Sequence, residues 1–422
     1  MNTVLVVTTL LILLRWAAQS LLEGVNLRHS RLHGMTPPPE IADRLDRESL
    51  PKTLAYTNAK GRLGLVEDGW SAIVLLVVVL SGVLPYAYQQ HIAFWGAGVW
   101  SHAGFLLAVT LVLAIPDLPL DWYAQFRLEE RFGFNKTTLR LWISDHIKVL
   151  LLGILLGFPL TALILFLTRW AALSWWLWAW GVVLLFQLTM LVLAPVLILP
   201  LFNKFSPLPD GPLRERLLAL ADRTGFQTST IQVMDGSRRS AHSNAFFTGL
   251  GRFRKIVLFD TLIHQLTDDE LEAVLAHEIG HYKLRHIPKT LMLSALGMLA
   301  GLFALFLLAN AAWFYQGFGF AQDSITPAFL MFNLLGGTVL FWIHPLTHAI
   351  SRKHEYQADA FAANHTDHGA DALGNALLKL HENNLSNPTP APVYSRFYYS
   401  HPTLSERLGH LSRLKTNAAP NQ

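Results

Sequence analysis

The chain has 422 residues, of which 52% are hydrophobic and 15% charged, and its mean hydropathy of +0.34 is typical of a membrane protein rather than a soluble enzyme. Its net charge is +4, and the basic residues lie in separate loops instead of forming a groove-sized patch. A nucleic-acid partner is therefore not expected.

Seven apolar stretches are long enough to cross a bilayer, which requires about 20 residues. They lie at 3–22, 69–88, 101–120, 147–168, 174–200, 290–313 and 326–347. The first could also be a cleaved signal peptide, but residues 1–4 lack the Lys or Arg that such a peptide carries. We predict an α-helical polytopic membrane protein with about seven spans. Buried core helices are the alternative for some of them.

The loops between the predicted spans differ in charge. Seven Lys or Arg lie in 23–67 and four in 121–146, whereas 89–100 and 314–325 have none. Because Lys and Arg are enriched in cytoplasmic loops, we expect the N-terminus outside and the C-terminus inside the cytoplasmic (inner) membrane. Residues 201–289 would then be cytoplasmic.

These features divide the chain into four parts. The parts are an N-terminal membrane domain with five spans (1–200), a cytoplasmic α+β region (201–289), two further spans (290–347) and a C-terminal helical region (348–422).

Short elements are predicted within the α+β region. Residues 213–223 have helical spacing, and β-branched apolar runs follow at 231–234, 245–247 and 256–259. These runs can form a small sheet ahead of the next helix.

One of these runs is a candidate substrate-binding edge. An exposed strand can pair with an extended peptide through backbone hydrogen bonds that do not depend on side chains. We assign this role to Asn244, Ala245 and Phe246. A turn shaped by Asn244 fits the residues equally well.

Residues 277–281 have the pattern HExxH. On a helix, His277 and His281 lie one turn apart on one face and can bind one zinc ion. Residues 267–270 form a capping box, which places the helix start about three turns before the motif. The alternative is a helix whose histidines have only structural hydrogen bonds.

A stable site needs a third protein ligand, which we assign to Glu355 in a helical stretch at 351–360. Asp359 lies one turn further on the same face and can accept the second ring N–H of a ligating histidine. Two histidines and one glutamate leave a fourth position for water, which is typical of catalytic zinc. For both acids the alternative is a solvated helix face.

Glu278 is the candidate general acid and base. It can take a proton from water activated by the ion and pass it to the leaving amine, while the ion polarises the scissile carbonyl. The chain has no cysteine, which excludes a thiol nucleophile and cysteine-ligated zinc, and it has no GxSxG motif. The predicted reaction is metal-dependent peptide hydrolysis without an acyl-enzyme.

Six motifs together resemble the type I CAAX prenyl endopeptidases, which are integral-membrane zinc metallopeptidases. They are FGFNK at 132–136, PLFNKF at 200–205, HSNA at 242–245, HEIGH at 277–281, EYQAD at 355–359 and HPTLSER at 401–407. The resemblance covers nearly the whole chain. It implies seven helices around a water-filled chamber, closed at one end by a small zincin-like catalytic domain that holds one zinc ion.

The resemblance also implies roles for individual residues. It supports His277, His281 and Glu355 as ligands, Glu278 as acid and base, and Asp359 as the acceptor behind a ligand. It further implies that His401 and Arg407 approach the site. One would stabilise the oxyanion, and the other would bind a substrate carboxylate or orient a ligand. The residues alone fit a loop and a surface helix as well.

The substrate class follows from the same resemblance. Eukaryotic members cleave prenylated CAAX peptides, whereas the compact loops of this chain are similar to those of bacterial members. We expect peptide or protein substrates, membrane lipid as a partner and activity on membrane-associated or misfolded polypeptides. The sequence gives no indication of oligomeric state.

Three alternative interpretations fit the sequence less well. A heat-shock membrane protease has fewer spans, and an intramembrane site-2-type protease has HExxH inside a span. A non-proteolytic scaffold or translocon-associated factor with a structural zinc would have no use for Glu278.

Overall fold

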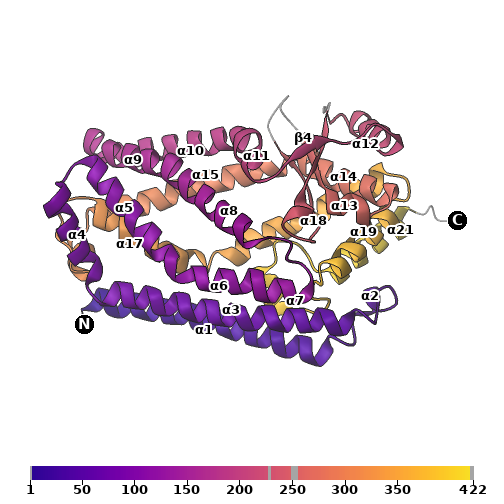
Figure 1. Ribbon diagram of the computed structural model, residues 1–422, viewed down its shortest axis with the longest axis horizontal. Helices are drawn as coiled ribbons and strands as arrows, with labels where there is room; N and C mark the ends of the chain where they lie inside the picture. The colour runs from indigo at the N-terminus through magenta and orange to yellow at the C-terminus, as the bar shows by residue number, and fades with distance from the viewer. Residues whose placement is uncertain (1, 227–229, 249–254, 419–422) are drawn as a thin grey trace.

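Long helices run along the length of the molecule, and a small sheet lies toward one end (Figure 1). The computed structural model describes residues 2–226, 230–248 and 255–418. Within these residues, six helices are long and apolar enough to cross a membrane, and a bent helix pair can supply a seventh span. The prediction of about seven spans is therefore confirmed.

The helices fall into a membrane part and a part near the sheet. The membrane part contains α1 (Thr3–His33), α3 (Leu50–Leu80), α4 (Val83–Trp95), α5 (Val99–Ala114), α6 (Leu118–Tyr123), α7 (Glu130–Phe132), α8 (Leu139–Leu152), α9 (Phe158–Trp170), α10 (Trp175–Leu193), α11 (Leu199–Phe202), α15 (His286–Ala309), α16 (Ala312–Gly317) and α17 (Thr326–Leu340). The remaining helices are α2 (Pro39–Ala42), α12 (Pro212–Arg223), α13 (Asp260–Gln265), α14 (Asp268–Lys283), α18 (His344–His365), α19 (Gly369–Asn383), α20 (Pro392–Tyr398) and α21 (Leu404–Ala418).

The second span differs from its predicted range of 69–88. Helix α3 begins at Leu50 and ends at Leu80, and α4 starts as a separate helix at Val83. Gly82 separates them with a φ of 73°, a left-handed conformation that glycine adopts without a Cβ clash. Hydropathy alone does not detect such a break, because the residues on both sides are apolar.

The last predicted span, 326–347, is also interrupted. Helices α17 and α18 are bent by 59° relative to each other. Pro345 lies in the first turn of α18, where its missing N–H is tolerated but would break a helix continuing from α17. The bend allows α18 to pack against α14.

The sheet has four strands, β1 (Phe205–Pro207), β2 (Ile231–Met234), β3 (Ala245–Thr248) and β4 (Lys255–Phe259), in the order β1-β2-β4-β3. Strands β2 and β4 are parallel, and the other pairs are antiparallel. The three predicted strands are confirmed. Strand β1 was not predicted because Pro207 argues against a strand, but β1 lies at an edge, where proline is tolerated.

Helix α14 begins at the predicted capping box. The Thr267 side chain accepts from the Glu270 N–H, and the Thr267 N–H donates to Glu270 Oε2 at 2.8 Å. Helices α12, α18 and α19 pack around α14, and its apolar side joins the core of this region. Core members include Leu217, Leu220, Ile256, Leu258, Leu262, Leu271, Leu275 and Ile279.

Helices α14 and α18 pack closely together at Gly280. A Cβ on Gly280 would lie 3.0 Å from Phe361 Cβ and 3.2 Å from Ala358 Cα. A side chain at this position of the HExxH motif would therefore require α18 to move by a few tenths of an ångström. The contact brings Glu355 and Asp359 of α18 against the histidines of α14.

We predict that Gly280→Ala pushes α14 and α18 apart. Overpacking of this kind costs about 1–3 kcal/mol of stability and should lower zinc affinity, because Glu355 moves with α18. The matched control is Gly297→Ala in α15, where a Cβ meets nothing within 4 Å. Melting temperature and zinc titration measure both effects, and equal behaviour of the two variants would refute this account of the helix contact.

His381 of α19 should make the stability of the region around α14 and α19 depend on pH. Its Nε2 is enclosed and has no hydrogen-bond partner among the described residues. Burial lowers the pKa of the ring from 6.5 to about 4. Between these pH values the unfolded chain binds more protons than the folded one, so stability falls as the pH falls from 6.5 toward 4.

We predict that this titration costs the wild type about 1–3 kcal/mol between pH 7 and pH 4.5. His381→Gln does not titrate, so its melting temperature should decline less over the same range. Other acidic groups titrate equally in both proteins and cancel in the difference. Parallel melting curves against pH would show that His381 does not contribute.

Candidate metal centre

Three potential ligand atoms meet between α14 and α18. His277 Nε2 and His281 Nε2 are 3.2 Å apart, and each lies 3.4 Å from an oxygen of Glu355. Ligands of tetrahedral zinc at about 2.0–2.1 Å from the ion lie about 3.3–3.4 Å from one another. The distance between the two histidine nitrogens is close to the edge of a zinc tetrahedron, and each nitrogen lies at about that distance from a different oxygen of Glu355, Oε2 for His277 and Oε1 for His281.

Asp359 fixes the tautomer of His277. Its Oδ1 lies 2.9 Å from His277 Nδ1, so the ring donates from Nδ1 and directs the Nε2 lone pair toward Glu355. Arg407 holds the same carboxylate, with Nε donating to Oδ2 at 2.9 Å and Nη2 donating to Oδ1. Asp359 is fully buried, so these bonds satisfy its charge.

His281 is oriented by residues to which the sequence analysis gave no role. Its Nδ1 lies 3.0 Å from His286 Nδ1, and His286 Nε2 lies 2.9 Å from Gln357 Oε1. The amide oxygen only accepts, so His286 donates from Nε2 and accepts from His281 at Nδ1. His281 then has its Nε2 lone pair free for a metal. A histidine five positions after a ligand is too weak a pattern to reveal this bond from sequence.

The donor set therefore fits a cation. Two imidazole nitrogens and a carboxylate face one another, and Glu355 Oε2 lies 3.4 Å from His277 Nε2 and 3.9 Å from Arg407 Nη1. Such a buried cluster is unfavourable unless a positive charge lies among the donors, and either a second proton on His277 or a bound cation supplies it. Nitrogen and oxygen ligands in this number and spacing suit zinc.

The surroundings of His277 favour its doubly protonated form when no metal is bound. Burial alone lowers its pKa, but hydrogen bonds to Asp359 and Glu355 outweigh burial and raise the pKa to about 9. A metal at Nε2 would displace this proton, so metal affinity should weaken as the pH falls.

Glu278 lies beside the donors without belonging to them. It lines a cavity of about 140 Å³ together with His277, Glu355, Asn244 and Ala245. Burial raises the pKa of its carboxyl, while the two nearby histidines partly oppose this shift. The carboxyl is therefore a stronger base than an exposed glutamate.

Strand β3 is an edge strand that borders the same cavity. Asn244 O accepts from Phe259 N at 3.1 Å on β4, so the peptide groups of the next residue, Ala245, point away from β4. The Ala245 N–H donates to Asn244 Oδ1 at 2.9 Å. Phe246 packs against Phe259 and is not among the residues that line the cavity.

The structure also brings His401 and Arg407 to the centre. His401 Nε2 lies 3.4 Å from Glu355 Oε1, and its ring also borders a larger cavity of about 750 Å³. Arg407 is 8% exposed, so it lies on the buried face of α21 and not on a face open to solvent. Burial lowers the pKa of Arg407, but the charge of Asp359 outweighs burial and raises it, so the guanidinium stays charged.

Comparisons with known proteins give the family. Residues 26–204 match the CAAX prenyl protease N-terminal domain of five membrane helices, and residues 207–415 match peptidase family M48. CAAX prenyl protease 1 of Saccharomyces cerevisiae is 38% identical over 412 residues, which cover 90% of this chain and 89% of the yeast protein. A Dictyostelium discoideum homologue is 35% identical over 92% of this chain and 93% of its own length.

A solved structure agrees with these matches. The crystal structure of S. mikatae Ste24p has a TM-score of 0.92 and 33% identity to this chain, and the match covers 97% of this chain and 99% of the other. The chain belongs to the CAAX prenyl protease family. It is an integral-membrane metalloendopeptidase, and the predicted helical membrane fold with a small zincin-like domain is confirmed.

We predict that His286→Phe in this CAAX prenyl protease homologue weakens zinc binding by about 10–100-fold, because it removes the acceptor that orients His281. The control is His354→Phe. The His354 ring stacks on His286 at 4.0 Å between centroids, so this substitution preserves an aromatic stack without touching His281 Nδ1. Chelator competition measures both dissociation constants, and equal values would exclude the orienting role.

Proposed function

We propose that His277, His281 and Glu355 bind one zinc ion and that the chain cleaves peptide bonds at this ion. The observation that carries the proposal is the set of donor-to-donor distances of 3.2 and 3.4 Å, with both histidine tautomers fixed from behind. A bound zinc ion supplies a Lewis acid that activates water and polarises the scissile carbonyl.

Glu278 is the proton carrier of this reaction. Its carboxylate accepts a proton from the attacking water and returns it to the nitrogen of the leaving amine. The raised pKa brings the carboxyl closer to neutral pH, which favours both transfers. Its place in the cavity beside the ligands allows it to reach a water and a substrate bound there.

Strand β3 holds the substrate as an additional strand. The outward-facing peptide groups of Ala245 offer one acceptor and one donor to an extended chain. Asn244 must release the Ala245 N–H when a peptide binds, because its Oδ1 now accepts from that group. Phe246 supports the strand through its packing on Phe259.

Arg407 and His401 have different roles. Arg407 positions Asp359, and through it His277, and its Nη1 also lies 3.9 Å from Glu355 Oε2. His401 has a 63% exposed side chain next to Glu355, so its ring can donate to the carbonyl oxygen of a bound peptide.

The substrates are extended segments of membrane-associated or misfolded polypeptides. The larger cavity beside His401 is lined by Tyr394, Tyr398 and Tyr399, which suits apolar residues near the scissile bond. The Lys and Arg residues of the loops support an orientation with the N-terminus outside and the metal centre on the cytoplasmic side of the membrane. The relatives named above are CAAX prenyl proteases, so prenylated CAAX peptides are the first alternative substrates to compare.

We predict that Glu278→Gln lowers kcat by about 10²–10⁴-fold, because the amide cannot carry the proton. Zinc content should stay at one ion per chain, since Glu278 is not a ligand. Glu215→Gln on the exposed side of α12 is the control and should retain full activity. The assay is cleavage of a quenched fluorescent peptide by the detergent-purified chain, with prenylated and unprenylated CAAX peptides in parallel.

The outcomes separate the parts of this proposal. Zinc binding without any Glu278-dependent cleavage would favour a scaffold that uses zinc structurally. Equal cleavage of both peptides would show that this chain does not require the prenyl group.

A further inference from the structure

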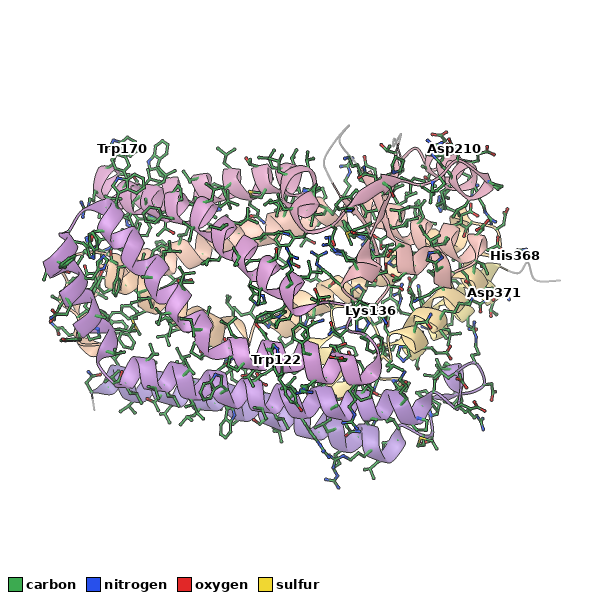
Figure 2. All side chains as sticks on the ribbon, viewed as in Figure 1. Trp122, Lys136, Trp170, Asp210, His368 and Asp371 are labelled. Atoms are coloured by element: carbon green, nitrogen blue, oxygen red, sulfur yellow. The ribbon has the colours of Figure 1, made fainter. Side chains whose placement is uncertain are left out.

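A cavity of about 490 Å³ lies among the membrane helices, at the end of the molecule away from the metal centre. The ends of α5, α9, α10, α15 and α17 surround it. Figure 2 marks this end with Trp170, while Asp371 lies at the other end of the molecule. The cavity shares no lining residue with the cavities beside the metal ligands.

The buried part of this cavity carries polar groups without partners. His102 is 3% exposed, and neither of its ring nitrogens meets hydrogen-bond geometry with a described residue. Thr326 is fully buried, and its Oγ1 also lacks a partner within the described ranges. Buried polar groups are nearly always paired, and a rotation of the Thr326 hydroxyl or of the His102 ring, which lies against the backbone of Ala97, would bring either group to a ligand in the cavity.

The cavity also contains two opposite charges that are not paired with each other. Arg169, at the end of α9, donates from Nη2 to Ala97 O at 2.8 Å. Asp323, shortly before α17, has no hydrogen bond or ion pair with any residue that the structure describes. Both side chains are exposed. A ligand with one anionic and one cationic group would pair with both.

Exposed tryptophans place the cavity at the level of lipid head groups. Tryptophan is enriched at the two membrane interfaces, where its ring is apolar and its N–H is solvated. The exposed tryptophans near these helix ends are Trp95, Trp100, Trp170, Trp178 and Trp313. Leu173, which is 74% exposed, lines the cavity beside this belt and offers an apolar path for an acyl chain.

We propose that this cavity binds the phosphoethanolamine head group of a phospholipid. The phosphate faces Arg169, and His102 and Thr326 donate to phosphate or ester oxygens once their side chains rotate toward the cavity. The primary ammonium faces Asp323. This site is independent of the metal centre and of the proposed proteolytic mechanism.

Native mass spectrometry of the detergent-purified full chain tests the proposal. The wild type should retain phosphatidylethanolamine about tenfold more tightly than phosphatidylglycerol, which has the phosphate but lacks the ammonium. Asp323→Asn should abolish this preference. Arg169→Gln should weaken both lipids by about tenfold or more, because each loses a charge-assisted hydrogen bond to its phosphate.

The control is Arg140→Gln, which removes an exposed arginine at the start of α8, outside the cavity lining. It should leave both affinities unchanged. Peptide cleavage and melting temperature show that each variant is folded.

Three results would overturn the assignment. The first is equal retention of the two lipids by the wild type, and the second is an Arg140→Gln effect as large as that of Arg169→Gln. The third is binding of soluble phosphoethanolamine as tightly as the lipid, which would make the cavity a solute site.

Discussion

The close packing of α14 against α18 is the contact on which the metal centre depends. At Gly280 the two helices are so close that a Cβ would lie only 3.0–3.2 Å from atoms of α18. Glu355 and Asp359 thereby come within reach of two histidines that precede them by two membrane helices. The 59° bend between α17 and α18 serves the same contact, because it turns α18 toward α14.

The charges behind the ligands form one connected network. Asp359 accepts from both His277 and Arg407, and Glu355 faces both histidines as well as His401. In a buried network each charge is stabilised by its partners, so removal of one leaves another unpaired. Substitutions of these residues should therefore change stability and metal affinity by more than the sum of the separate contacts. Double-mutant cycles are needed to measure how strongly the residues are coupled.

Local sequence patterns predicted the elements of the site, while contacts between distant segments determined its details. The capping box at Thr267 and strands β2, β3 and β4 follow from short patterns whose physical causes are local. The break at Gly82 and strand β1 were missed, because hydropathy hides the first and Pro207 argues against the second. The direction of the His281–His286 hydrogen bond is set by Gln357 of α18, and Arg407 is buried only when α21 packs against α18 and α19.

His286 belongs to two parts of the molecule at once. It is the first residue of the membrane helix α15, and it also accepts the hydrogen bond that orients His281. During synthesis, Glu355 is made only after α15 and α17, because it lies in α18. A newly made chain therefore has no complete centre until both helices are inserted and α18 has returned to α14. Proteolytic competence is in this way tied to the completion of membrane assembly.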